Sequence, residues 1–288
     1  MQSIYELATN IFEPLKRFWE TPRTERAISG ALVVIFLMAL AGIELKRRGM
    51  LPGPIAVHTP DHHFDAVGVA FSLVLILEVI GLIFALPCSF SKAMGKQFEI
   101  LSLIFLRNAF KELVHLPEPI RMTTEWTPLL HIVAYGVAAL IIFGLLGVYS
   151  RMPAPKHRVP QSASDRYAFI ASKKILTLTL LAAFAWLGVE AVVRHISHDH
   201  EFDFFDTFYT ILVFADILLV LLAQRFFPGY LAVFRNSGYA LATLCIRLAL
   251  AAPPYYNVAL GTGAAVYAIA LTWTFNRLAQ IPETDAHT

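Results

Sequence analysis

The chain has 288 residues, of which 57% are hydrophobic and only 15% are charged, and its formal net charge is +2. The mean hydropathy of +0.61 is far above that of a soluble globular domain, so the composition predicts a membrane protein. The small net charge gives no support for nucleic acid binding. No stretch outside the apolar runs is large enough to form a separate catalytic domain.

Eight apolar runs are long enough to cross about 30 Å of hydrocarbon at about 1.5 Å per helical residue. They lack the alternating polar face of barrel strands, so they are predicted to be helices. The runs are 28–45, 66–88, 97–115, 128–149, 171–192, 204–226, 234–252 and 256–276. The predicted fold class is therefore all-α, a polytopic membrane protein with eight transmembrane helices.

Residues 1–22, ahead of the first run, carry apolar residues at helical spacing, with Pro14 as a predicted kink. These apolar residues are Ile4, Leu7, Ile11, Leu15, Phe18 and Trp19. The pattern favours an amphipathic helix, which either lies in the headgroup region of the membrane or caps the helix bundle.

The chain contains one pattern twice. The segments 61–107 and 199–247 both begin with Asp-His-X-Phe-Asp and continue as two apolar runs. An acidic residue follows 13 positions after the last Asp in each, as Glu78 and Asp216. A module of about 125 residues is thus duplicated, and four helices per module make the two copies parallel repeats. The expected domains are an N-terminal segment 1–26, modules 27–151 and 171–280, a basic linker 152–170 and a tail 281–288.

The distribution of Lys and Arg predicts the orientation. With both termini inside, fifteen of these residues, Lys173 and Lys174 among them, fall on the inner side and six on the outer side. Both termini are therefore expected in the cytoplasm. The linker is expected there too, where its positive charge either fixes the topology or binds anionic headgroups.

Four ionisable residues fall at mid-membrane depth, namely Glu78 and Arg107 in the first module and Asp216 and Arg247 in the second. An unpaired charge at this depth is costly, so we expect the pairs Glu78–Arg107 and Asp216–Arg247 inside the bundle. Each pair is either a proton or ion site or a contact that fixes helix packing. A voltage sensor is disfavoured because each third helix has only one such Arg.

Acidic and imidazole side chains gather at the predicted outer edge of the membrane. The acidic candidates are Glu44, Asp65, Glu190 and Asp203, and the candidate metal ligands are His62, His63, His195, His198 and His200. Such groups suit zinc or another divalent transition metal, although their spacing matches no established metal motif. They are either a metal site or ordinary polar loop residues.

Two further histidines permit a narrower hypothesis. His115 ends the third run and His131 begins the fourth on the same side, so they are candidate axial ligands of a haem. No nucleophile–base set or phosphate-binding loop is present in the sequence, so an enzyme is not expected.

In the second module Glu190 ends the first helix, Asp203 opens the second and Asp216 lies within it. Arg235 and Arg247 lie in the third helix, Pro254 lies near the start of the fourth, and Arg277 ends it. The matching positions of the first module are Glu44, Asp65, Glu78, Lys96, Arg107, Pro128 and Arg151. Each module thereby resembles the phosphate-starvation-inducible E (PsiE) family of small four-helix bacterial membrane proteins. The resemblance covers nearly the whole chain as two tandem copies. It implies residence in the bacterial inner membrane and induction under phosphate limitation, and it implies no established reaction.

Two functions stay open. In the first, the buried pairs exchange protons or ions beneath a His-rich outer face, in a stress- or ion-responsive membrane protein. In the second, the chain is a non-catalytic accessory or assembly subunit of a larger respiratory or transport complex, or of a homo-oligomer. A metal- or haem-binding membrane subunit is a further alternative.

Overall fold

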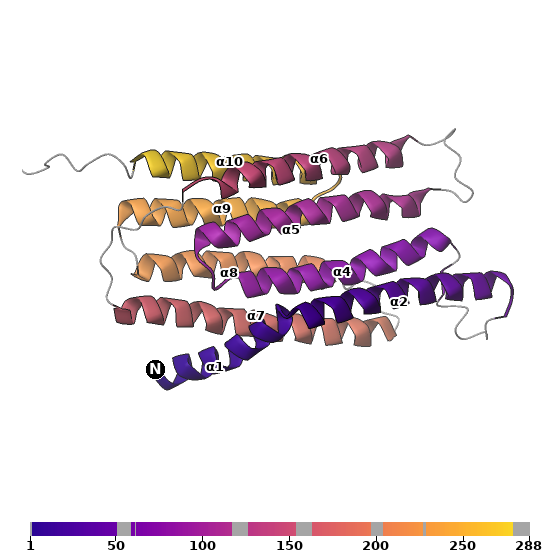
Figure 1. Ribbon diagram of the computed structural model, residues 1–288, viewed down its shortest axis with the longest axis horizontal. Coiled ribbons are helices and arrows are strands. Elements are labelled where there is room, and N and C mark those ends of the chain that lie inside the picture. Colours follow the sequence, from indigo (N-terminus) through magenta and orange to yellow (C-terminus); the bar gives the residue numbers. More distant parts are fainter. Residues whose placement is uncertain are drawn as a thin grey trace, which may run out of the picture. The chain divides into compact units, whose positions relative to one another are not determined.

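The structure is a computed structural model, and it describes residues 2–50, 59–60, 62–116, 126–153, 163–196, 204–226 and 229–278. Over these ranges the regular structure is entirely helical, as the apolar runs predict, and contains no β-strand. The helices, shown in Figure 1, are α1 (Gln2–Trp19), α2 (Pro22–Arg47), α4 (His63–Ala85), α5 (Phe90–Lys111), the 3₁₀ helix η1 (Glu112–His115), α6 (Thr127–Ser150), α7 (Ala163–Ile196), α8 (Phe204–Phe226), α9 (Tyr230–Ala251) and α10 (Tyr256–Leu278).

Each of the predicted apolar runs overlaps one of these helices. Within the described ranges, six helices are long and apolar enough to cross a membrane: α2, α4, α6, α7 over Ser164–Arg194, α8 and α10. The helices α5 and α9 are not among these six, and charged residues interrupt both, among them Arg107 in α5 and Arg235 and Arg247 in α9. The six apolar helices indicate a multi-pass membrane protein.

Proline residues set two of the helix boundaries. Thr21 precedes Pro22 and has extended backbone angles (φ −76°, ψ 131°), as sterics before Pro favour, and α2 begins directly after it. Ala252 precedes Pro253 and is likewise extended (φ −79°, ψ 152°), which ends α9. Tyr255 then takes a left-handed φ of 72° just before α10 begins.

Contacts divide the chain into two compact units. The first unit comprises Met1–Phe12, Leu82–Leu101 and Ile141–Thr288, and the second comprises Glu13–Gly81 and Ser102–Leu140. The helices α7 to α10 therefore belong wholly to the first unit, whereas α4, α5 and α6 contribute residues to both.

In the first unit, α7, α8, α9 and α10 pack in chain order, each against the next, and lie side by side in Figure 1. Both α9 and α10 bury small residues, which let helices approach closely in a membrane. Those at most 3% exposed are Ala242 and Ala249 in α9 and Ala264, Ala265 and Ala268 in α10. The hydroxyl groups of Tyr239 and Thr272 also meet across these helices at 2.8 Å.

The helices of the second unit also contact one another in chain order: α2 with α4, α4 with α5, and α5 with α6. His63 of α4 faces Glu44 of α2. Farther along, Phe71 of α4 stacks on Phe110 of α5 with ring centroids 5.6 Å apart. The Phe105 ring of α5 lies 6.1 Å from the ring of Tyr135 in α6.

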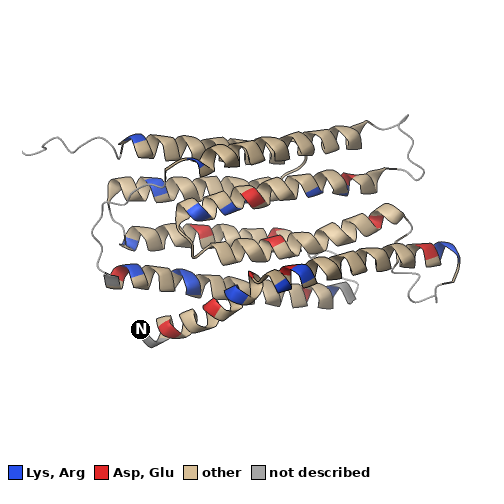
Figure 2. Ribbon diagram, in the orientation of Figure 1, with Lys and Arg blue, Asp and Glu red and all other residues tan. Residues whose placement is uncertain are grey.

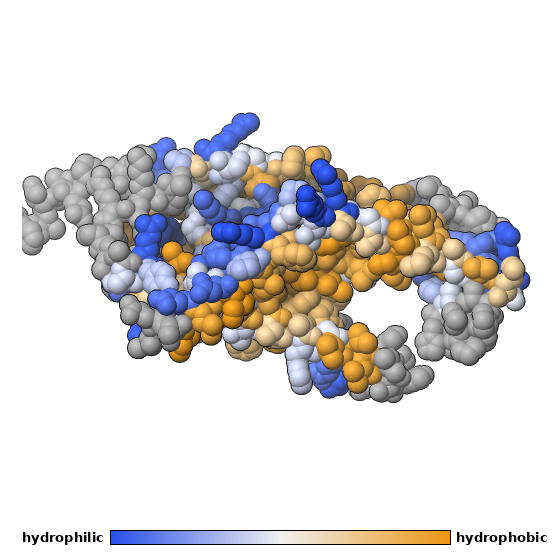
Figure 3. All heavy atoms as spheres, turned by 60° about the horizontal axis from the view of Figure 1, so that its bottom comes forward, coloured by the Kyte–Doolittle hydropathy of each residue, from blue (hydrophilic) through white to orange (hydrophobic). Residues whose placement is uncertain are grey.

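The helix surfaces are largely apolar. Figure 2 shows how sparse charged residues are on some helices: α6 carries none and α10 carries only Arg277. On α2, the side chains of Val33, Val34, Leu37 and Met38 are each more than half exposed. Figure 3 shows broad hydrophobic areas on the molecular surface. This is the surface expected of helices that face lipid rather than water.

The N-terminal segment forms the single helix α1, with Pro14 inside it. The predicted apolar residues Ile4, Leu7 and Phe18 are more than half exposed, whereas Phe12 is buried and its ring centroid lies 6.1 Å from that of Phe84. The helix therefore presents a large part of its apolar surface outward.

Candidate functional site

The acid–Arg pair of the second predicted module joins two neighbouring helices of the first unit. Asp216 on α8 faces Arg247 on α9, with 3.5 Å between Asp216 Oδ2 and Arg247 Nε. The Asp216 side chain is only 6% exposed and that of Arg247 is 0% exposed. Both charges are thus shielded from lipid and from water. Such a pair is less costly than either charge alone in the same place.

Arg247 is underbonded for so deeply buried a guanidinium. Its Nε, Nη1 and Nη2 atoms make no hydrogen bond to any residue that the structure describes, and neither does Asp216 Oδ2. At 3.5 Å the contact with Asp216 is an ion pair rather than a short, charge-assisted hydrogen bond. Buried polar atoms nearly always have hydrogen-bond partners, so a buried guanidinium and carboxylate without them are candidates for a functional site.

A cavity of about 20 Å³ lies beside Asp216 in the first unit. Its polar lining comes from four helices: Gln97 of α5, Lys173 of α7, Asp216 of α8, and Tyr239 and Thr243 of α9. The remaining lining is apolar apart from Cys88. The carboxylate thus borders a small cavity whose lining includes polar groups from four helices.

Lys173 is the unexpected member of this lining. Lys173 is only 3% exposed, and its Nζ donates a hydrogen bond of 3.0 Å to the backbone carbonyl of Cys88. The same Nζ lies 4.4 Å from the ring centroid of Phe90 and 4.8 Å from that of Phe169. Cation–π contacts of this kind favour the ammonium form of Lys173 over the neutral amine.

The corresponding pair of the first module lies in the second unit. Arg107 Nη1 of α5 contacts Glu78 Oε2 of α4, and the two side chains are 19% and 9% exposed. A cavity of about 30 Å³ beside this pair is lined by Ser72, Asn108 and Lys111 in addition to both members.

The two pairs share their construction and differ in burial. Each joins an acid on the second helix of a predicted module to an Arg on the third, and the acid of each borders a small cavity. The side chains of Arg107 and Glu78 are 19% and 9% exposed, whereas those of Arg247 and Asp216 are 0% and 6% exposed. The Asp216 pair is the more completely desolvated of the two, so it is the better candidate for a functional carboxylate.

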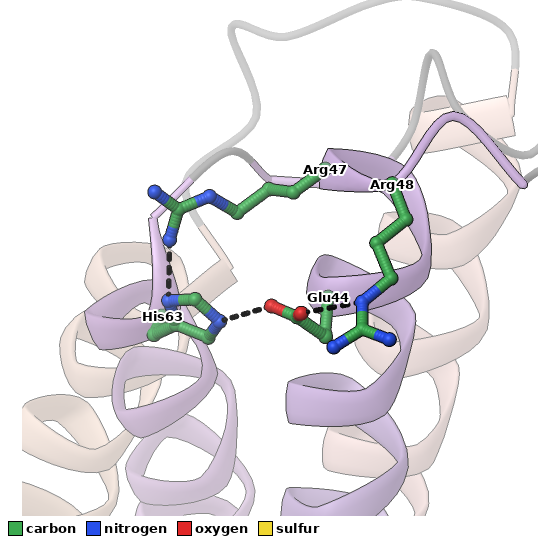
Figure 4. Close-up of polar contacts among 4 residues, drawn as sticks. All are labelled: Glu44, Arg47, Arg48 and His63. Atoms are coloured by element: carbon green, nitrogen blue, oxygen red, sulfur yellow. Dashed lines mark hydrogen bonds and ion pairs between the residues drawn. The ribbon is translucent and has the colours of Figure 1, made fainter.

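The predicted outer-edge acid Glu44 lies at the C-terminal end of α2. Figure 4 shows its carboxylate between Arg48, whose Nε lies 2.7 Å away, and His63, whose Nε2 lies 3.5 Å away. Arg47 Nη1 lies 3.0 Å from the other ring nitrogen of His63, Nδ1. Because a guanidinium can only donate, Nδ1 is the acceptor and this geometry fits neutral His63 with its proton on Nε2.

The other outer-edge candidates form local contacts or lie outside the described residues. Asp65 Oδ2 accepts a hydrogen bond from the backbone N–H of His62 at 3.3 Å, and Glu190 accepts from Arg194 within α7 at 2.6 and 3.0 Å. Asp203, His198, His200 and the side chain of His195 lie outside the described part of the chain. Within that part, no three His, Cys, Asp or Glu residues gather as a metal site would require.

The candidate haem ligands lie near the end of α5 and on α6. His115 ends η1, and His131 lies in the first turns of α6. His131 Nδ1 lies 3.1 Å from Glu112 Oε2, so Nε2 is the nitrogen with which His131 would bind a metal. Metal-binding histidines usually have a carboxylate hydrogen-bonded to their second ring nitrogen, as His131 has here. The haem hypothesis itself stays a prediction.

Sequence reasoning missed Lys173 and Gln97 as part of a site. Lys173 was counted only among the positive residues of the inner side, and Gln97 is a single amide in α5. The available signal was that both interrupt predicted helices with a polar group while neither has an obvious partner nearby in sequence.

Comparisons with known proteins give no relative for this chain. No family model matches it, no curated protein matches it, and no solved structure matches it.

Proposed function

We propose that this multi-pass membrane protein moves or senses protons or other small ions through its two buried acid–Arg pairs. The observation that carries the proposal is the Asp216–Arg247 pair, which is almost fully buried, separated by 3.5 Å without a hydrogen bond, and bordered by a small cavity with polar groups in its lining. A carboxylate placed in this way inside a membrane protein can exchange its cationic partner for a proton or an ion. Ionisable residues at such depth are functional candidates for this reason.

In the proposed architecture α5 and α9 also cross the membrane, which gives eight spans in two parallel repeats, modules 27–151 and 171–280. Both helices have 22 residues, or about 33 Å at the rise of an α-helix. α9 packs against both α8 and α10, each of which is apolar enough to span, so α9 shares their depth. Its polar residues Arg235, Asn236 and Arg247 are buried in protein, which keeps them away from lipid.

The same neighbour order in both units and the matching acid–Arg pairs support the duplication. The resemblance of each module to the PsiE family supports a bacterial inner-membrane protein with a role under phosphate limitation or a related stress. The excess of Lys and Arg on one side supports cytoplasmic termini.

A second function, an accessory or assembly subunit of a membrane complex, is favoured by a different observation. The helix α1 exposes Ile4, Leu7 and Phe18. An apolar surface of this kind suits another membrane subunit as well as it suits lipid. A partner that copurifies in stoichiometric amount after mild extraction, seen by native mass spectrometry, would support this function, and a lone protein would oppose it.

The test of the ion function is flux in proteoliposomes that carry a pH or salt gradient. Glu78→Gln combined with Asp216→Asn is expected to abolish the flux. The control is Glu190→Gln, which removes a carboxylate whose partner Arg194 is on the same helix and which is 32% exposed, so flux should persist.

Neutralising Asp216 alone leaves Arg247 as an unpaired buried charge, and misfolding would then imitate loss of function. The variant Asp216→Asn/Arg247→Gln removes both charges together and avoids this cost. Loss of flux in this folded double variant supports the proposal. Wild-type flux in the Glu78→Gln/Asp216→Asn protein, or no flux in the wild type for any small ion, refutes it.

A further inference from the structure

We propose that the cavity beside Asp216 is a site for ordered water, held by Lys173 and Gln97 and bonded to the Asp216 carboxylate. The water site stands on the geometry of the first unit alone. Its role in delivering protons to Asp216 rests on the ion function proposed above.

The size of the cavity fits this occupant. A volume of about 20 Å³ exceeds the roughly 10–15 Å³ that one water molecule needs, and it is too small for an organic ligand. The cavity is lined by α5, α7, α8 and α9 together with the residues that follow α4. It therefore holds one water or a very small number of them.

The polar groups of the lining also match water. Gln97 is 5% exposed, and its Oε1 makes no hydrogen bond to any described residue. Asp216 Oδ2, which lies 3.5 Å from Arg247 Nε, is a second buried acceptor without a hydrogen bond in this part of the chain. The Lys173 ammonium has three N–H donors, and the Cys88 carbonyl accepts only one of them.

Other small occupants fit this lining less well. A metal cation is disfavoured because the ammonium of Lys173 lines the same space. An anion is disfavoured by the carboxylate of Asp216 and the amide oxygen of Gln97. Water satisfies all three groups, because it donates two hydrogen bonds to oxygen acceptors while accepting one from an ammonium.

Bound water would let Asp216 act in either protonation state. It donates a hydrogen bond to the carboxylate and accepts one from the carboxyl O–H, so the carboxyl group keeps a partner when its proton leaves or arrives. Lys173 and Gln97 are positioning residues in this scheme, since they act on Asp216 through the water.

Hydroxyl-radical labelling of the full-length protein in lipid nanodiscs tests the site directly, with water as the probe. Radicals formed from bound water modify the side chains that line it, and Tyr239 lines the cavity although it is only 1% exposed. Tyr209 is the matched control, a buried tyrosine at 6% exposure in α8 that is not part of the lining. Tyr239 is expected to be labelled well above Tyr209.

Two variants should remove this signal. Gln97→Leu and Lys173→Met replace a polar group with an apolar one of similar length, and each is expected to reduce Tyr239 labelling to the level of Tyr209. Lys174→Met is the control, because the Lys174 ammonium lies over the ring of Phe12, 5.7 Å from its centroid, and does not line the cavity. Wild-type labelling of Tyr239 no greater than that of Tyr209, or labelling unchanged in both cavity variants, overturns the water site.

Proteoliposome flux separates the two proposals. If the ion function holds, Gln97→Leu and Lys173→Met should slow flux roughly tenfold, the effect of about one lost hydrogen bond, while Lys174→Met should not. A labelled Tyr239 in a protein without flux would refute the ion function and leave the water site in place. Flux that is lost in the Asp216→Asn/Arg247→Gln protein but normal in both cavity variants would refute the water's role in delivery and leave the ion function.

Discussion

Removing Arg247 alone should destabilise the protein more than almost any other single charge removal. At 3.5 Å, and with an effective dielectric constant of about 20, the attraction between Asp216 and Arg247 is about 5 kcal/mol. The variant Arg247→Met deletes this attraction and leaves a carboxylate that is 6% exposed without its counter-ion. We expect a loss of about 3–5 kcal/mol in the free energy of unfolding, as is usual when one member of a buried pair is removed.

The double variant Asp216→Leu/Arg247→Met should recover most of this loss. It removes both desolvated charges and replaces them with apolar groups, which is often neutral or stabilising in protein interiors. The coupling energy of the double-mutant cycle should therefore be large. By contrast, Glu190→Gln breaks a pair whose side chains are 43% and 32% exposed, so it should cost only about 0.2–1 kcal/mol.

The assay is reversible unfolding by dodecyl sulfate in mixed micelles, followed by far-ultraviolet circular dichroism. The free energy of unfolding is measured for the wild type, both single variants and the double variant. If the two single losses simply add in the double variant, within about 0.5 kcal/mol, then the two charges do not interact across α8 and α9 and the reasoning is wrong.

Three further outcomes can be measured with the same assay. Gly238→Ala should lose about 1–3 kcal/mol, because the new Cβ would lie 2.6 Å from Leu271 Cδ2; an unchanged stability would contradict the tight contact of α9 with α10. Gly263→Ala meets nothing within 4 Å and should be neutral or gain up to about 1 kcal/mol, and a loss as large as that of Gly238→Ala would refute this explanation. Tyr239→Phe should lose about 0.5–1.5 kcal/mol through its 2.8 Å contact with the Thr272 hydroxyl, and a loss of the same size in a Thr272→Val background would show that the bond is not formed.

The candidate site was foreseeable only in part. The pairing of Glu78 with Arg107 and of Asp216 with Arg247 could be predicted because an unpaired charge at mid-membrane depth is unfavourable in free energy. Each charge therefore needs an opposite charge at the same depth, and the neighbouring helix carries one. The role of either pair and the PsiE resemblance stay predictions. The eight-span architecture does too, since α5 and α9 are not among the six helices that meet the apolar criterion within the described ranges.

The sequence by itself determined the class of the protein and the positions of its helices. Both follow from local properties, namely the length and hydropathy of each run and prolines such as Pro22 and Pro253. These properties act over one or two helical turns, so they can be recognised before the chain is folded.

Tertiary structure alone decided which polar groups meet at the cavity beside Asp216. Lys173 donates to the carbonyl of Cys88, 85 positions earlier in the chain, and it borders one cavity with Gln97 and Asp216 from two other helices. No local pattern encodes such a meeting, because it depends on how α5, α7, α8 and α9 pack. The sequence could therefore place a positive charge at Lys173, but only the packing of the first unit shows that this charge is buried beside a carboxylate.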